Sequence, residues 1–531
     1  MSARKVGYIA GEVETGSFWF VSDLEDFPPR HEYLIIPHVR ERSSSGFKDV
    51  EVLAQVSRIA NYSDILGERL SLQELETIIS RYSGNTKVYG EASILGYMSE
   101  SGEVLMPRSA AIPGQEVFVA PTETLERFFA RDVKSGIPIG NLITRDEVRV
   151  VIDPNGFRRH VAIIAQTGAG KSYLVGLMLE RLLPLGATII VFDPNSDYVM
   201  MRRDSGGNPT KIADDVVIYR PPGISGRRHS DEEIGGSESY TIDFSSLGSE
   251  GIQDVAGISS QWTHIIKAIE SALQGLQGYY EPRQLIEALT NLSNDDQYPE
   301  QRAAGNALSY IKRLQKYPIW GNKDIPITDL IRPMHMSIID LAGLQRRVSA
   351  YIVSKTLEDI WSRAVTGDLD FPIFVVLEEA HNFAPASGGD RAASSAIIER
   401  IAAEGRKFGI FLTVITQRPN KINSNVLSQC NSQIIMRLTN PDDMSAVRRS
   451  SEGLSEELFQ DLPGLNRGEA IIVGELTKVP TMVKVTGRQS GEGGSDIDIV
   501  GALERARGKH KFDMHAEEKP DQKDSEYRTK W

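Results

Sequence analysis

Residues 160–183 read HVAIIAQTGAGKSYLVGLMLERLL: a short apolar run, a glycine-rich turn, and an apolar helix that opens with a lysine and a serine. In such a turn, successive backbone N–H groups point into one concavity at the positive end of a helix dipole, where a polyphosphate binds. The pattern therefore predicts a phosphate-binding loop in which Lys171 reaches the β- and γ-phosphates of ATP and Ser172 ligates Mg²⁺.

The loop departs from the usual pattern G-x-x-x-x-G-K-[ST] at one position, because Ala165 stands where the first glycine is expected. Alanine is the least damaging replacement, since it restricts that turn but leaves the later glycines, the lysine and the serine in place. We expect the nucleotide to be bound by the loop and by one carboxylate beyond it: Gln166, Thr167, Gly168, Ala169, Gly170, Lys171, Ser172, Tyr173 and Asp193.

A chain of 531 residues is too long for one core and predicts two or three domains. Its net charge of −13 argues against a surface that coats nucleic acid non-specifically, but paired arginines such as Arg227 and Arg228 allow a local basic channel. No apolar run approaches the ~18 residues that span a bilayer, so we expect a cytoplasmic protein with no membrane partner. The single cysteine, Cys430, excludes an intramolecular disulfide and argues against a zinc site.

The N-terminal residues 1–120 alternate short apolar runs with turns, which is typical of a small β-barrel, and one helix is expected near Leu70 to Tyr82. This segment carries no catalytic constellation. We therefore expect it to dock a partner or neighbouring copies of the chain. The polar residues 121–145 are interpreted as a linker.

The remainder alternates β-branched runs with helical periodicity, which predicts an α/β ATPase core built on parallel strands. Its first part is expected over 146–252 and its second part over 331–485. Between them, 253–330 has helical periodicity without a motif and is interpreted as a helical insertion. Residues 486–531 are expected to form a C-terminal extension that ends in a mobile tail.

A second chemical motif, FPIFVVLEEAHNFAP at 371–385, is an apolar strand that delivers two adjacent carboxylates, Glu378 and Glu379. Consecutive strand residues point opposite ways. We expect Glu378 to face Mg²⁺ and its water shell, while Glu379 faces an attacking water as general base. Gln417, at the end of the next strand, is suited to sense the γ-phosphate. Arg406 is a candidate charge for a site, either its own or a neighbour's.

The succession of EGRKFG, TQRP and LSQCN, together with RHVAIIAQTGAGKS and VVLEEAHNF, resembles the HerA family of hexameric DNA-translocating ATPases, relatives of the FtsK-type motors. The opening GYIAGEVETGSFWFVSD is similar to the N-terminal HAS-barrel of that family. The resemblance spans nearly the whole chain. It is broken at DPNSDY, where relatives often read DPHGEY, so that Asn195 and Asp197 replace a histidine and a glutamate.

This resemblance implies a homo-hexameric ring of RecA-like domains, with ATP and Mg²⁺ bound between subunits and double-stranded DNA in the central channel. It implies that Glu379 activates water, that Gln417 senses the γ-phosphate, and that Arg406 and Arg159 act near or across the subunit boundary. It also implies a partner. Family members typically work with a nuclease, commonly NurA, in DNA end resection, and some bacterial members pair with Sir2-like or nuclease effectors in defence against phage.

Two functions follow from these observations. The first is an ATP-driven hexameric DNA translocase or helicase that works with such an effector. The second is a ring-shaped scaffold that assembles and activates the effector with little translocation of its own. A conjugation-type or packaging-type motor is disfavoured, because those that act at membranes usually carry a spanning segment, and none is seen in this sequence.

Overall fold

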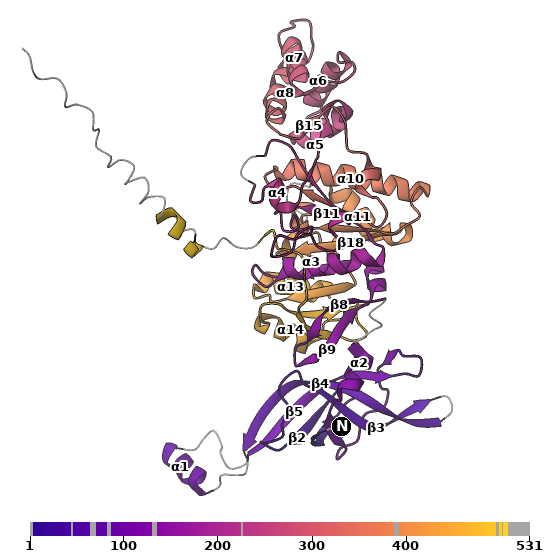
Figure 1. Ribbon diagram of the computed structural model, residues 1–531, viewed down its shortest axis with the longest axis vertical. Helices are drawn as coiled ribbons and strands as arrows, with labels where there is room; N and C mark the ends of the chain where they lie inside the picture. Colours follow the sequence, from indigo (N-terminus) through magenta and orange to yellow (C-terminus); the bar gives the residue numbers. More distant parts are fainter. Residues whose placement is uncertain are drawn as a thin grey trace, which may run out of the picture.

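A computed structural model describes residues 4–43, 46–63, 71–81, 86–129, 135–224, 227–386, 392–494, 499–501 and 503–507. Figure 1 shows an elongated molecule with a β-barrel at one end, an α/β domain in the middle and a group of helices at the other end. The predicted mobile tail lies outside the described residues beyond 507. Among the described residues, no helix is both long and apolar enough to cross a bilayer.

The N-terminal barrel consists of antiparallel strands whose alternate residues are buried, as the spacing of apolar runs predicts. Its sheet has the order β2-β1-β7-β3-β4-β5-β6, and a further pairing of β2 with β5 closes it, so that six strands form the wall and β6 adds to one edge. Phe18, Phe20 and Leu34 fill its interior. The strands are β1 (Lys5–Val13), β2 (Ser17–Ser22), β3 (Tyr33–Ser43), β4 (Gly46–Ser63), β5 (Thr86–Met98), β6 (Val104–Leu105) and β7 (Glu116–Val119). The expected helix is α1 (Leu72–Arg81).

The segment 121–145, interpreted from its polarity as a linker, contains regular structure. Helix α2 (Thr122–Phe129) buries Leu125, Phe128 and Phe129, and the Phe129 ring lies 5.1 Å from that of Tyr33 in the barrel. Strand β8 (Ile137–Leu142) pairs with β9 (Arg145–Ile152) and joins the sheet of the α/β domain. The apolar stripe of a short helix was hidden among its charged residues, so polarity alone did not show that this segment packs.

The central sheet places the two chemical motifs on nearby parallel strands. Its order is β13-β12-β16-β11-β17-β18-β10-β19-β20-β21-β8-β9, parallel from β13 to β19 and antiparallel from there to β9. The succession β19-β10-β18-β17-β11 is the strand order of a RecA-like fold, as predicted. The strands are β10 (Val161–Ile164), β11 (Thr188–Asp193), β12 (Val216–Arg220), β13 (Glu238–Ser239), β16 (Met336–Asp340), β17 (Ile373–Leu377), β18 (Ile410–Thr416), β19 (Ser432–Met436), β20 (Glu469–Val473) and β21 (Thr481–Val485).

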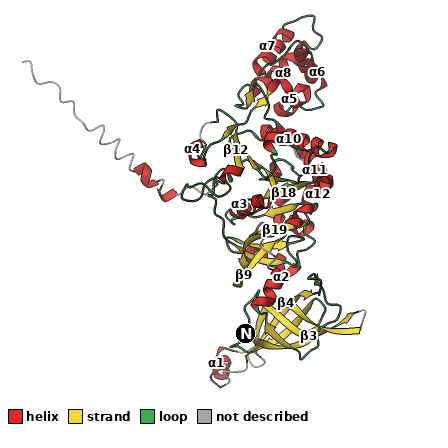
Figure 2. Ribbon diagram, turned by 45° about the vertical axis from the view of Figure 1, so that its right-hand side comes forward, coloured by secondary structure: helices red, strands yellow, loops and turns green. Residues whose placement is uncertain are grey.

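Helices cover both faces of this sheet, and the helical insertion projects from one end of it (Figure 2). Two minor strands, β14 (Ile242–Asp243) and β15 (Trp320–Gly321), pair at its base. The insertion comprises α5 (Gly248–Ala256), α6 (Thr263–Gln274), α7 (Pro282–Ser293), α8 (Gln301–Leu314) and α9 (Ile327–Leu330). The helices of the core are α3 (Lys171–Leu182), α4 (Asp231–Ile234), α10 (Arg346–Thr366), α11 (Ser395–Glu404), α12 (Ser424–Ser428), α13 (Pro441–Ser450) and α14 (Glu456–Asp461).

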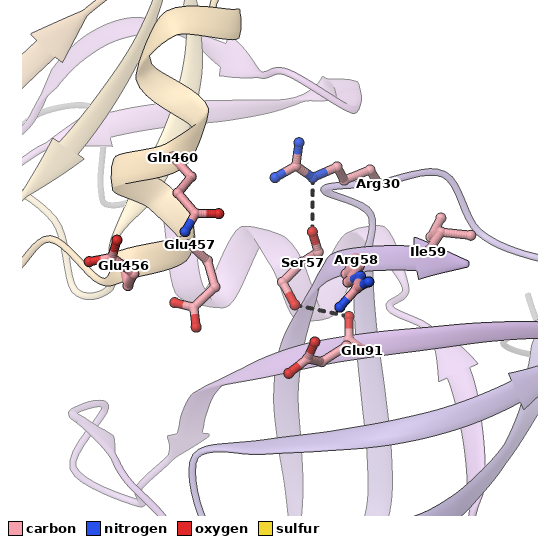
Figure 3. Close-up of a pocket in the computed structure, with 8 residues that line it drawn as sticks. All are labelled: Arg30, Ser57, Arg58, Ile59, Glu91, Glu456, Glu457 and Gln460. Carbon is pink, nitrogen blue, oxygen red and sulfur yellow. Dashed lines mark hydrogen bonds between the residues drawn. The ribbon is translucent and has the colours of Figure 1, made fainter. Parts of the chain in front are cut away.

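The barrel and the α/β domain meet across a polar junction. Arg30 forms an ion pair with Asp461 at the end of α14, and Arg145 Nε lies 2.9 Å from Glu32 Oε1. A cavity of about 430 Å³ opens beside these contacts, and Figure 3 shows Arg30 and Arg58 of the barrel on one side and Glu457 on the other. The loop that carries Arg30, His31 and Glu32 is therefore occupied by contacts with the α/β domain.

A buried ion-pair network joins the carboxyl ends of two strands. Arg220, at the end of β12, donates from Nε to Asp340 Oδ2 at 2.9 Å and from Nη1 to Asp231 Oδ1 at 2.9 Å. Asp340, at the end of β16, also accepts from Ser196 Oγ at 2.8 Å. Arg220 is 3% exposed and Asp340 is fully buried, so each charge depends on the other for its compensation.

We expect Arg220→Met to destabilise the α/β domain by about 3–5 kcal/mol, because it leaves the Asp340 carboxylate buried without a cation. The measurement is the midpoint of unfolding in a denaturant series, followed by far-UV circular dichroism. Arg158→Met is the matched control, since Arg158 is an exposed arginine of the same domain. Equal midpoints for the two variants would contradict a compensating role for Arg220.

Candidate nucleotide-binding site

The phosphate-binding loop connects β10 to α3 and is held between the ends of two neighbouring strands. Gln166 N donates to Arg437 O at 3.0 Å, and Gly468 N donates to Ala169 O at 2.9 Å. Gly168 and Gly170 have φ of 78° and 105°, a left-handed conformation that glycine adopts without strain. Ala165 is fully buried against β18, and its N lies 3.3 Å from Thr416 O, so a methyl group is accommodated at this position.

At the start of α3, the Lys171 side chain is buried between two carboxylates. Its Nζ is hydrogen-bonded to Glu378 Oε1 and lies 3.1 Å from Glu379 Oε1. Burial opposes the charge on Lys171, but the two carboxylates outweigh burial and raise the pKa of the lysine. The sequence places these residues more than 200 positions apart, and the sheet brings them into contact.

The two glutamates at the end of β17 differ in environment. Glu378 is fully buried, its Oε2 accepts from Tyr198 OH at 2.5 Å, and burial raises its pKa. Burial alone would also raise the pKa of Glu379. The adjacent His381, whose Nδ1 lies 3.3 Å from Glu379 Oε2, and the charge on Lys171 together lower it to about 2. Glu379 therefore stays ionised, as an acceptor of a proton from water must be.

The backbone of Glu379 has φ of 49°, in the left-handed region that residues other than glycine rarely adopt. It lies two residues after β17 ends at Leu377 and caps a short 3-10 turn, Ala380–Asn382. The reversal of the chain at this point turns the Glu379 side chain toward Lys171 as well, so the simple alternation of strand residues ends at Glu378. Backbone strain of this kind gathers at functional sites.

Gln417 lies against the phosphate-binding loop. It follows β18, the strand between those of the loop and of the glutamates, and its Oε1 accepts from Thr167 Oγ1 at 2.6 Å. Gln166 contacts Thr439 Oγ1 at 2.9 Å. The loop is thus bordered on both sides by polar side chains from the ends of β18 and β19.

The two carboxylates of the DPNSDY turn have different partners, and Asp193, which was expected to bind nucleotide, contacts the backbone instead. Asp193 is fully buried and accepts from the backbone N of Asn195 and of Tyr198, so it closes the turn that follows β11. Burial raises its pKa well above the usual range. Asp197 instead accepts from Ser172 Oγ at 3.1 Å. Asp197 is therefore the carboxylate of this turn that reaches the serine expected to ligate Mg²⁺, and sequence reasoning did not assign it a role.

The C-terminal extension supplies another residue that sequence reasoning missed. Arg488 donates from Nη1 to Ser172 O at 2.7 Å, and its backbone N donates to Tyr173 OH at 3.1 Å. Its guanidinium lies over Gly176, where a methyl group would approach Arg488 Cζ to 2.3 Å. A glycine in the middle of an otherwise apolar helix was the available signal for this close approach.

The two arginines proposed for the subunit boundary lie away from this site. Arg159 precedes β10 and Arg406 precedes β18, whereas the loop, the glutamates and Gln417 follow their strands. Parallel strands share their directions, so both arginines lie at the opposite edge of the sheet. Both are exposed, and Arg159 Nε lies 3.1 Å from Glu475 Oε1. In this subunit neither arginine joins the cluster around Lys171.

The family model described as "Helicase HerA, central domain" matches residues 137–360. The protein named "Probable helicase MJ1565" of Methanocaldococcus jannaschii is 29% identical, and the match covers 94% of each chain. The DNA double-strand break repair helicase HerA of Pyrococcus furiosus is 29% identical over 85% of this chain and 89% of its own.

Among solved structures, VirB4 of Thermoanaerobacter pseudethanolicus superposes with a TM-score of 0.47 at 18% identity, covering 66% of this chain and 96% of VirB4. The family match spans the loop, and the two relatives from archaea extend over most of the chain. The chain is thus similar to HerA helicases over most of its length, and it is an ATPase.

Proposed function

We propose that the chain is an ATP-driven DNA translocase or helicase that works as a homo-hexamer. The observation that carries this proposal is the convergence of Lys171, Glu378 and Glu379 at one edge of the parallel sheet, with Gln417 beside the loop. Ligands of parallel α/β sheets bind at the carboxyl ends of the strands. The name of the relative from Pyrococcus furiosus, a DNA double-strand break repair helicase, supplies the link to DNA.

The residues present fit ATP with Mg²⁺. The left-handed glycines leave open space above Gly168, where an added methyl group would meet no atom within 4 Å. Lys171 would hold the phosphates, and Ser172 would ligate the metal, with Asp197 beside its hydroxyl. In this structure Glu378 Oε1 contacts Lys171 and Glu378 Oε2 accepts from Tyr198. Once Lys171 turns to the phosphates, Oε1 would face the metal through its water shell. Bound Mg²⁺ would neutralise charge that develops on the phosphates.

In this proposal the roles in hydrolysis follow from environment. Glu379, which is ionised, orients the attacking water and takes its proton. Gln417 reports the γ-phosphate through its contact with Thr167. Arg488 positions the start of α3 by holding Ser172 O, and touches no expected reacting atom.

Glu379→Gln should keep ATP binding and lose nearly all turnover, because the amide keeps the shape of the side chain but cannot accept the proton. Lys171→Ala should lose binding itself. The measurements are phosphate release and the shift in Tm with added ATP and Mg²⁺. A Glu379→Gln variant that gives no ATP-dependent shift, or that hydrolyses ATP at the wild-type rate, would contradict the role of Glu379.

The positions of Arg159 and Arg406 support a ring. Because both lie at the sheet edge opposite Lys171, either could act on ATP only if a neighbouring subunit presented its site to that edge. An arginine that stabilises the transition state in this way is worth about 10³ to 10⁵ in rate. In a closed ring, which we propose to be a hexamer, every site has such a neighbour.

Arg406→Ala or Arg159→Ala subunits mixed into wild-type rings should lower turnover by more than their share of the subunits, since each would silence a neighbour's site. The measurement is ATPase rate against mutant fraction, with light scattering to establish the hexamer. Arg158→Ala is the matched control, an exposed arginine next to Arg159. A linear fall for both test variants would mean that neither acts across a coupled interface.

The barrel is proposed as the docking site for a partner, either a NurA-like nuclease or a defence effector such as a Sir2-like protein. The loop with Arg30 and Glu32 is occupied at the junction. The hairpin of β3 and β4, which pairs Arg40 with Asp49, projects sideways from the barrel (Figure 1) and is the part of the barrel better placed for docking. Double-stranded DNA is proposed to occupy the central channel of the ring.

A ring that serves as a scaffold for an effector remains the second candidate, favoured by a barrel that is built without a chemical motif. The two are separated by assays on the protein without any partner. A translocase should show an ATPase rate stimulated severalfold by duplex DNA and should displace a triplex-forming strand. A scaffold should show neither. Glu379→Gln is the control for ATP dependence in both assays.

A further inference from the structure

A cavity of about 370 Å³ lies between the helical insertion and the central sheet, away from the phosphate-binding loop. One wall is the carboxyl end of α8 and the residues that follow it, with Arg313, Lys316 and Tyr317. The other wall is the loop after β16, with Leu344 and Gln345. That loop begins immediately after Asp340, so the cavity opens near the same sheet edge as the nucleotide site.

The cavity is lined by groups that donate hydrogen bonds. Arg313 and Lys316 are exposed. The Arg313 guanidinium lies 5.0 Å from the centre of the Tyr310 ring, and its Nε donates to Ser309 O at 3.2 Å, so its outer N–H groups are oriented by the helix. Tyr317 OH donates to Gln345 Oε1 at 2.7 Å, which leaves the Gln345 amide nitrogen available as a donor.

The charge around Tyr317 is positive. Burial raises the pKa of this phenol, and the charges that oppose the shift are those of Arg313 and Arg347. Along α8 the charges are separated: Glu300 precedes the first turn, where it contacts His264, and Lys312 and Arg313 occupy the last turn. Two adjacent cations, Lys312 and Arg313, therefore lie at the end of the helix that meets the sheet, and Arg302 lies alone in its first turn, although the chain as a whole carries −13.

The arginine-bearing loop that follows β12 borders this cavity. A methyl group added to Gly223 would lie 3.2 Å from Pro318 Cβ, and one added to Gly343 would lie 2.8 Å from Ile224 Cγ2. Beyond these contacts Arg227 turns inward and donates to Pro221 O. Arg227 is thus committed to its own loop, and the cations that line the cavity are Arg313 of α8 and Lys316 just after it.

We propose that this cavity binds the phosphodiester backbone of duplex DNA through Arg313 and Lys316, with the amide of Gln345 as an additional donor. The inference rests on the proposed action on DNA and assigns a contact surface to it. Phosphate oxygens are bound well by an exposed arginine with oriented N–H groups and by a neighbouring lysine. Contacts of this kind contribute to affinity for DNA but do not distinguish one base sequence from another. The helical insertion, which has no motif, would then serve to hold these cations beside the sheet edge.

The test compares two double variants of the full-length protein. Arg313→Ala with Lys316→Ala removes the proposed contacts. Lys267→Ala with Arg302→Ala removes the same charge from exposed positions of the same helical insertion, and Arg302 lies about 16 Å from Arg313 along α8. Binding of a fluorescent blunt duplex is measured by anisotropy over a series of KCl concentrations, with light scattering and Tm to establish that both variants assemble.

The Arg313 and Lys316 variant should lose about tenfold or more in affinity at low salt. Its slope of log K against log[salt] should become shallower by about 0.9 for each phosphate that the protein no longer neutralises. The control variant should match the wild type within about twofold. Exchanging the two residues, Arg313→Lys with Lys316→Arg, should largely keep the slope because both charges remain.

Three outcomes would overturn the inference. If the wild type binds duplex and the test variant has the same slope, this surface does not contact phosphate, and the proposed function stands. If both double variants lose the same affinity, the effect is general electrostatics, and again only the inference fails. If the wild type itself shows no salt-dependent binding to duplex in the presence of ATP, the proposed action on DNA fails together with this surface.

Discussion

The contact of one buried lysine with two carboxylates constrains the rest of the molecule. Lys171 is 5% exposed, and a charge so buried is stable only beside its counter-ions. The counter-ions come from Glu378 and Glu379, at the end of a strand that is not adjacent to β10. The β18 strand must therefore be inserted between them in register, and that places Gln417 on Thr167. The order of these strands therefore determines which residues meet in the site.

Much of this arrangement could be predicted from the sequence. The barrel, the parallel core and the helical insertion follow from the spacing of apolar residues, because burial on one face leaves a periodic trace. The phosphate-binding loop could be predicted because its conformation requires glycines at fixed positions, which here are Gly168 and Gly170. The two glutamates stand out because an apolar strand rarely ends in adjacent carboxylates. These signals are local, so one sequence is enough to show them.

What escaped prediction depends on contacts between distant segments. Asp197 could be recognised as an acid from the sequence, but only the fold shows that Ser172 is its partner. The fold also shows that Asp193 accepts hydrogen bonds within the turn that follows β11. Arg488 lies over 300 residues from Ser172, and its role rests on the space left by Gly176. The interpretation of 121–145 as a linker rested on polarity, whereas α2 packs by three apolar side chains that its charges conceal.

The two edges of the parallel sheet divide the work of the domain. One edge gathers the groups proposed to bind and hydrolyse nucleotide. Hydrogen bonds through Asp197, Ser196, Asp340 and Arg220 extend from it toward the loop bordering α8. Ser196, which donates to Asp340 and directly precedes Asp197, has φ of 59°, so the turn that carries Asp197 is strained. A buried polar network of this kind holds its members in one arrangement, because a group that moved would leave its partner without a hydrogen bond.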